Sequence, residues 1–157
     1  MSCSTGPPSL FEITTEANFL VPAGLDNIRT HTWPLQNIRT NIDLLTQGVE
    51  RELIDGVFAR EAIIESPFVN FDFRLVNMVA INVWDPQKPE DKREVFFMDR
   101  RNNNTRERLP LFSSLSEVKD ILLNPTFDAE VKIRFATFTP TEIESRLTMN
   151  FVANGKQ

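Results

Sequence analysis

Hydrophobic and polar residues alternate with a period of two in several parts of the chain, which is the pattern of β-strands that bury one face. The clearest cases are residues 130–135, where Val131, Ile133 and Phe135 alternate with charged residues, and residues 146–151. In the second segment, leucine, methionine and phenylalanine alternate with polar residues. Because each segment has one polar face, we predict that the two form an antiparallel pair with that face in water.

Shorter apolar runs in the N-terminal part predict strands at residues 10–14 and 18–21, the second ended by Pro-Ala-Gly. The tetrapeptide Asn-Ile-Arg-Thr then occurs twice, at residues 27–30 and 37–40. Two copies fall short of the three or more units that a repeat architecture needs. We interpret them as two short edge segments that meet at a bend formed by Trp33-Pro34.

Residues 41–65 carry two conflicting signals. Apolar residues recur every three or four positions between Ile42 and Val57, as on one face of a helix. However, the dipeptide Asp55-Gly56 is favoured in tight hairpins, and each glycine costs a helix about 1 kcal/mol relative to alanine. We therefore predict a helical or turn-like start up to about residue 47, followed by a hairpin through Asp55-Gly56.

The segment 68–84 is the longest apolar-rich stretch. Its first half alternates strictly, whereas beyond Asn77 both faces carry apolar residues. This pattern predicts one long strand, or two strands joined by a bulge near Asn77. The polar loop 85–92 then turns the chain, and residues 94–98 return as a strand to complete a hairpin.

One helix is predicted between the later strands. Ser114 and Glu117 have the spacing of a capping box, in which two side chains satisfy backbone N–H groups at a helix start. Apolar residues at positions 115, 118, 121 and 122 would share one helical face. Asn124-Pro125 would end the helix.

Many short strands, long polar loops and one or two short helices predict a mainly β protein, an antiparallel β-sandwich of jelly-roll-like type. Strands do not alternate with helices, which argues against a doubly wound α/β fold. A chain of 157 residues fits one domain. We expect an N-terminal arm over residues 1–9, a single sandwich domain over residues 10–153 and a C-terminal tail over residues 154–157.

The composition narrows the classes of function. A net charge of -5 argues against a protein whose surface binds nucleic acid or anionic lipid. The chain has 13 phenylalanines and no tyrosine, which argues against a site that binds sugars through tyrosine hydroxyls. With a single cysteine, Cys3, it suits a reducing compartment. The sequence contains no apolar run of about 18 residues, so we expect no membrane span. The first residues lack the features of a secretory signal.

Residue types that perform catalysis or bind metals are scarce. One histidine, His31, and one cysteine cannot supply a catalytic triad or a structural zinc site. The acidic residues between Asp85 and Glu94 are interleaved with lysine and arginine and match no calcium-loop spacing. The five glycines form no phosphate-binding loop. We therefore expect no enzymatic activity, no cofactor and no metal site.

Four arginines crowd the polar loop 99–109. A guanidinium group can form paired hydrogen bonds with carboxylates or phosphates. A solvated loop is the simplest interpretation, and contact with acidic groups of a neighbouring subunit is the next. Contact between this loop and nucleic acid is the last interpretation, because the rest of the chain has no stripe of basic residues. The candidate interaction residues are Arg100, Arg101, Arg106, Arg108, Trp33 and Phe11.

Together these features favour a non-enzymatic structural protein of a large assembly, namely a virion component such as a capsid, decoration or tail protein. A β-sandwich is a plate whose loops and arms can bind neighbours. Its partners would be copies of itself and other structural proteins. We expect it in the virion, assembled in a reducing cytoplasm, with a cytoplasmic protein as the alternative.

The alternative function is a soluble β-sandwich adaptor or ligand-binding module that acts as a monomer or small oligomer. A pocket lined by Phe68, Phe71, Trp84 or Trp33 would favour it. An enzyme of an unfamiliar type would instead need a deep pocket that holds several carboxylates with raised pKa values.

Overall fold

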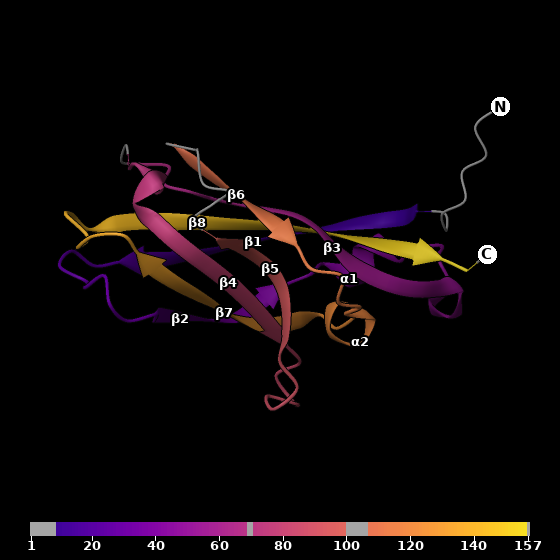
Figure 1. The fold of residues 1–157 in the computed structure, drawn as a ribbon. Helices are drawn as coiled ribbons and strands as arrows, with labels where there is room; N and C mark the ends of the chain where they lie inside the picture. The colour runs from indigo at the N-terminus through magenta and orange to yellow at the C-terminus, as the bar shows by residue number, and fades with distance from the viewer. Residues whose placement is uncertain (1–8, 69–70, 100–106, 157) are drawn as a thin grey trace.

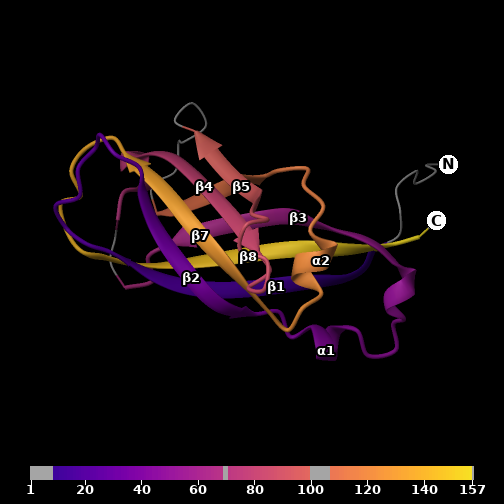
Figure 2. The same ribbon diagram turned by 90° about the horizontal axis from the view of Figure 1, so that it is seen from below.

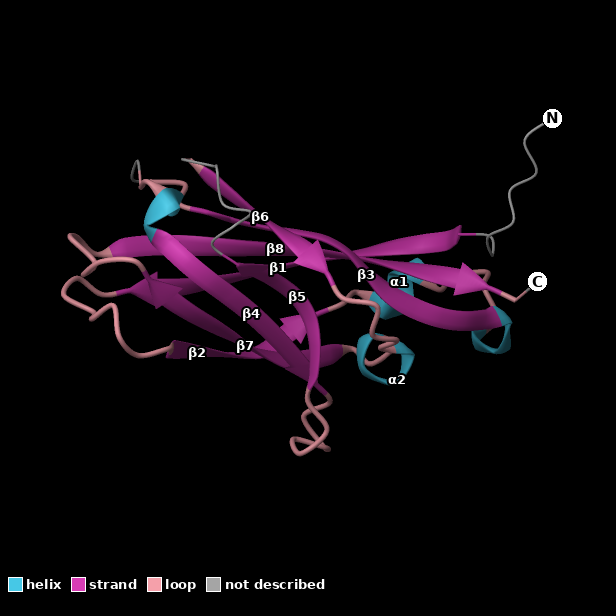
Figure 3. Ribbon diagram, in the orientation of Figure 1, coloured by secondary structure: helices cyan, strands magenta, loops and turns pink. Residues whose placement is uncertain are grey.

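A computed structural model describes residues 9–68, 71–99 and 107–156 (Figure 1). Strands dominate the described residues, and the helices are short (Figure 3). The strands are β1 (Ser9–Val21), β2 (His31–Arg39), β3 (Ile54–Glu65), β4 (Val76–Trp84), β5 (Arg93–Asp99), β6 (Arg108–Ser113), β7 (Thr126–Phe135) and β8 (Ile143–Gly155). The helices are α1 (Ile42–Leu45) and α2 (Lys119–Leu122), with 3-10 turns at Arg51–Leu53 and Phe73–Leu75.

The strands form an almost closed antiparallel sandwich in the order β1-β8-β3-β6-β5-β4-β7-β2. One layer contains β1, β8 and β3, and the facing layer contains β2, β7, β4 and β5 (Figure 2). Strand β6 pairs with β3 and with β5, so it closes one side. Within the described parts of the chain, β1 and β2 lie at the ends of the order, and each pairs on one side only. The prediction of a mainly β, jelly-roll-like antiparallel sandwich is thus confirmed.

The core lies between the two layers and is rich in phenylalanine. Phe151 of β8 contacts two rings of the facing layer, Phe96 of β5 at 5.7 Å between ring centroids and Phe127 of β7 at 6.3 Å. All three side chains are fully buried. Edge-to-face contacts of this kind add to the free energy gained from apolar burial, so these rings join the two layers.

The predicted pairing of the last two strands is wrong. Strand β8 pairs with β1 and β3, whereas β7 pairs with β2 and β4, so the two strands lie in different layers. Their alternation correctly indicates one buried face for each. A period of two does not state which neighbour a strand pairs with, and the connection 136–142 crosses between the layers.

The predicted strands at residues 10–14 and 18–21 are one strand, β1, because its pairing with β8 continues without a register shift from Phe11 to Val21. Thr15 between them is buried, and its hydroxyl donates to the Met149 carbonyl oxygen (3.4 Å). The two Asn-Ile-Arg-Thr copies differ in structure. The first is a loop in which Ile28 is exposed, and the second largely belongs to β2, where Ile38 is buried. Trp33-Pro34 lies within β2, so the predicted bend there is wrong.

Residues 41–65 begin with α1, which confirms the helical start, but the hairpin at Asp55-Gly56 is wrong. Strand β3 runs through this dipeptide, with a bulge between Ile54 and Gly56. A Cβ atom at Gly56 would lie 2.8 Å from the ring of Phe58. The glycine therefore permits close packing at a bulge rather than a turn.

In residues 68–84, strand begins only at Val76, after the turn Phe73–Leu75. The Asp72 side chain accepts a hydrogen bond from the Arg74 N–H group (3.0 Å) and caps this turn. The predicted strand before Val76 is therefore wrong for the described residues. The register of β4 on β7 shifts between Val76 and Met78, so an irregularity lies near Asn77 as expected, but it does not join two strands. The hairpin of β4 and β5 is also confirmed.

Helix α2 starts at Lys119 without the predicted capping box. The Glu117 carboxylate accepts hydrogen bonds from the N–H groups of Val57 (3.0 Å) and Lys119 (3.1 Å) instead. Leu115 is 94% exposed, although the positions 118, 121 and 122 are buried as expected. At the chain ends, Ser9 belongs to β1 and residues 154–155 belong to β8.

Candidate functional site

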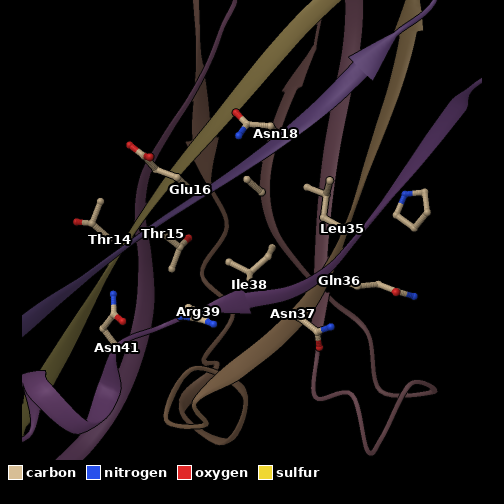
Figure 4. Close-up of a pocket in the computed structure, with 12 residues that line it drawn as sticks. Thr14, Thr15, Glu16, Asn18, Leu35, Gln36, Asn37, Ile38, Arg39 and Asn41 are labelled. Carbon is tan, nitrogen blue, oxygen red and sulfur yellow. The ribbon is translucent and has the colours of Figure 1, made fainter.

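The open side of the sandwich lies between the edge strands β1 and β2 and holds a groove of about 740 Å³ (Figure 4). Residues 14–18 of β1 line one wall, and residues 34–39 with Asn41 line the other. We call it the seam groove. Leu35 and Ile38 point from β2 toward β1 and are buried, whereas Glu16 and Asn18 are exposed (Figure 4). The groove thus has an apolar floor and polar walls.

The edge of β2 is poorly suited to pairing with another strand. Pro34 has no N–H group to donate, and the register of β2 on β7 shifts between Leu35 and Ile38. Within that bulge, Asn37 adopts a left-handed conformation (φ 57°) and donates its N–H group to the Asp128 carboxylate (3.0 Å). Bulges and prolines are the devices that protect sheet edges from unwanted pairing.

The edge of β1 lacks these protections. From Phe11 to Val21 the strand pairs with β8 without a register shift, and it contains no proline, glycine, lysine or arginine. A long, regular edge of this kind offers a row of backbone N–H and C=O groups to another strand. Of the two walls of the seam groove, β1 is therefore suited to pairing with another strand and β2 is not.

Trp33 closes one end of the seam. Its indole N–H group donates to the Leu20 carbonyl oxygen of β1 (2.8 Å). The half-buried ring lies 5.6 Å from the ring of Phe19 and 6.5 Å from that of Phe135. Phe11, also half-buried, packs on the core and lies opposite Ala153 of β8. The interaction roles predicted for Trp33 and Phe11 stay predictions.

Arg108 begins β6 on the closed side of the sandwich, and its Nε atom lies 3.7 Å from the Glu65 carboxylate of β3. It is exposed and lies away from Trp33 and Phe11. The other three candidate residues, Arg100, Arg101 and Arg106, lie outside the described residues.

An exposed aromatic pair on the closed side was missed from the sequence. Phe97 of β5 and Phe112 of β6 are opposite each other in register, with ring centroids 6.0 Å apart. They are 38% and 46% exposed. Neighbouring outward positions on β3, β6 and β4 are also apolar. We call Phe97, Phe112, Pro110, Ile63 and Ala80 the aromatic patch.

A polar hollow of about 650 Å³ beside α2 is held together by its own charges. Arg93 donates to Asp120 through both terminal nitrogens (2.6 and 2.8 Å) and to Asp91 (2.9 Å). Lys119 donates to the Ile54 carbonyl oxygen (2.6 Å). These groups connect α2 to β3 and β5. We therefore interpret the residues of the hollow as structural rather than as a binding site.

We expect the Asp120→Asn variant to lose less stability than the unchanged protein when the pH is lowered. The hydrogen bonds from Arg93 lower the pKa of the Asp120 carboxyl below its ordinary value of 3.8. A group with a lower pKa in the folded state stabilises the fold above its unfolded pKa, and this contribution is lost as the pH falls below about 4. Urea unfolding from pH 6 to pH 2.5 measures the effect, with Glu90→Gln in an exposed turn as the control. Parallel pH profiles for Asp120→Asn and the unchanged protein would contradict it.

The residues considered for catalysis or metal binding do not come together in one site. His31 lies against Trp33, with Nε2 3.0 Å from the Asp26 carbonyl oxygen. In the part of the chain that the structure describes, no three His, Cys, Asp or Glu side chains gather to hold a metal ion. No helix among the described residues is long and apolar enough to span a membrane.

The four aromatic residues that would favour a ligand-binding module do not meet in one pocket. Phe71 is buried against Phe73 (5.1 Å between ring centroids), and Trp33 packs on the core. Trp84 lies under the Lys92 ammonium group at 4.5 Å. Phe68 lines a hollow of about 460 Å³ that it shares with the end of β1 and the start of β8.

The chain matches no known family and no curated protein. Among solved structures, it is similar to a chain of the cyanophage Pam1 capsid asymmetric unit, with a TM-score of 0.44, 10% identity and coverage of 97% of this chain and 91% of that chain. It is also similar to Desmodium yellow mottle tymovirus (TM-score 0.28, 10% identity, coverage 100% and 94%). A third similarity is to Xylanase10C of Cellvibrio japonicus (TM-score 0.33, 10% identity, coverage 96% and 28%). These likenesses are too distant to support a function.

Proposed function

We propose that this protein is a non-enzymatic structural subunit of a larger assembly and that it binds neighbouring subunits through the seam groove and the aromatic patch. The observation that carries the proposal is the position of these two surfaces on opposite sides of one sandwich. In the strand order, β1 and β2 are the ends, and β6 and β5 are the middle. When such a sheet is rolled almost closed, its ends and its middle face away from each other.

Two contact surfaces on opposite sides let one subunit join more than one neighbour. A ring, shell or tube needs this property, whereas a single surface stops at a dimer. The two surfaces also differ in chemistry. The seam groove offers backbone groups between polar walls, and the aromatic patch offers exposed rings, which are common in the centre of protein interfaces.

The specific form of this proposal is a virion component, a capsid, decoration or tail protein, whose partners are copies of itself and other structural proteins. Eight-stranded antiparallel sandwiches of the jelly-roll type serve in viral capsids, and they also serve in lectins and cupins. The fold therefore supports a role in a virion by analogy alone. Electron microscopy of the particles that the protein forms tests this form directly, because it shows whether copies tile a shell or ring a tube.

We expect the double variant Phe97→Ser, Phe112→Ser to weaken self-association while leaving the fold intact. Both rings are already more than one third exposed, so the monomer loses little packing. Removing two partly exposed rings from an interface should cost about 2 kcal/mol, or roughly 30-fold in Kd. Light scattering and sedimentation across a concentration series measure this loss.

The matched control is the variant Leu115→Ser, Phe138→Ser, which removes two exposed apolar side chains outside the aromatic patch. It should associate like the unchanged protein. A protein that stays monomeric at the highest concentrations reached would overturn the proposal of a subunit and favour the adaptor. If both double variants associate equally, the aromatic patch is not one of the contact surfaces.

A further inference from the structure

We infer that the seam groove receives the β1 strand of a second copy, so that two copies pair their β1 edges antiparallel about a two-fold axis. This inference rests on the proposed function and names the partner of one of its two surfaces. Two identical strand edges related by a two-fold axis perpendicular to the strands are antiparallel, and the N–H groups of each copy can donate to the C=O groups of the other.

The direction of the free backbone groups follows from Trp33. Its indole binds the Leu20 carbonyl oxygen from the side of β2, so Leu20 directs its backbone groups toward the open side. In a regular strand, residues two positions apart direct their N–H and C=O groups to the same side. Because β1 is regular on β8 from Phe11 to Val21, four further residues direct their groups into the seam. They are Glu12, Thr14, Glu16 and Asn18.

Axes at Thr14, Thr15 and Glu16 lie nearest the middle of the free edge at residues 12–18, and the side chains of β1 favour one of these three registers. An axis at Thr14 would place Glu12 opposite Glu16 of the second copy, and an axis at Glu16 would place that carboxylate opposite itself. Like charges directly opposite each other destabilise a strand pair. Both registers are therefore unfavourable.

An axis at Thr15 avoids these contacts. It places Thr14 opposite Glu16 and Glu12 opposite Asn18, so a hydroxyl and an amide can each donate to a carboxylate. It also places Leu10 opposite Leu20, two exposed apolar side chains that are 36% and 45% exposed in the single copy. Thr15, whose side chain is buried and whose backbone groups face β8, then meets its own copy at the axis. The outward face of β1 is thus self-complementary in this register.

Cysteine cross-linking tests the register. With Cys3→Ser as the background, Thr14→Cys and Glu16→Cys are prepared separately and mixed in equal amounts under mild oxidation. Directly opposite residues have Cα atoms about 5.5 Å apart, within disulfide range, whereas residues displaced along the ladder lie farther apart. We expect the mixed 14–16 disulfide to form at least about tenfold faster than either symmetric disulfide, and the 12–18 pair to behave alike.

A charge variant gives a second readout that needs no disulfide. Asn18→Asp places a carboxylate opposite Glu12 at two symmetric contacts and should raise the dimer Kd about fivefold, whereas Asn18→Lys should not raise it. If the unchanged protein associates but shows neither the 14–16 preference nor this charge dependence, the β1 pairing is wrong and the structural subunit stands. If the unchanged protein does not associate at all, the proposed function itself fails.

Discussion

Replacing Phe151 with alanine should lower the free energy of unfolding by about 3–5 kcal/mol, because the change removes a buried ring and leaves a cavity. Phe151 is fully buried on β8, and its ring meets Phe96 and Phe127, which belong to the facing layer. The side chain therefore joins the two layers of the sandwich. Urea unfolding at neutral pH, followed by circular dichroism and by fluorescence, measures the loss.

Phe138→Ala is the matched control, because that ring is 60% exposed in a loop. It should change the free energy of unfolding by less than about 0.5 kcal/mol. A loss for Phe151→Ala no larger than the loss for this control would mean that the layers do not pack through the ring. Such a result would contradict the sandwich as described.

Period-two patterning predicted the class of fold because it reports burial on each strand separately. Residues 130–135 and 146–151 each bury the face that their alternation indicates. The same patterning cannot state which strands are neighbours, since pairing depends on contacts between residues far apart in the sequence. The two segments were accordingly placed side by side, although the structure puts them in opposite layers.

Local turn signals failed where a residue serves packing instead of chain reversal. Asp55-Gly56 suits a hairpin, but here the glycine leaves room for the Phe58 ring at a bulge in β3. Trp33-Pro34 suits a bend, but an edge strand also tolerates proline because its free N–H side needs no partner. Each signal has two physical meanings, and tertiary contacts decide between them.

The two candidate surfaces depend on features that a single sequence does not display. The seam groove exists because β1 and β2 end the strand order, which is a long-range property. Pro34 and the second Asn-Ile-Arg-Thr copy, interpreted as an edge segment, were the local signals that β2 is an edge strand. The aromatic patch depends on a register shift in β5, where Val95 and Phe96 are both buried, so that Phe97 points outward.

Replacing Trp33 with alanine should have opposite effects on stability and on association. The half-buried ring packs against Phe19 and Phe135, so its loss should lower the free energy of unfolding by about 2–3 kcal/mol. It also frees the Leu20 carbonyl oxygen, which adds one residue to the free edge of β1. Two copies paired through β1 should then associate more tightly, as sedimentation of the folded protein would show.

Trp33→Phe separates the two contributions of the indole. The smaller ring keeps the contacts with the core but cannot donate to Leu20, so the free energy of unfolding should fall by only about 1 kcal/mol. The tighter association should remain, because it depends on the freed carbonyl group and not on the lost packing. If Trp33 instead contacts a neighbouring subunit directly, as the sequence alone suggested, Trp33→Ala would weaken association. The sign of the change in Kd therefore decides whether this residue closes the seam or reaches across it.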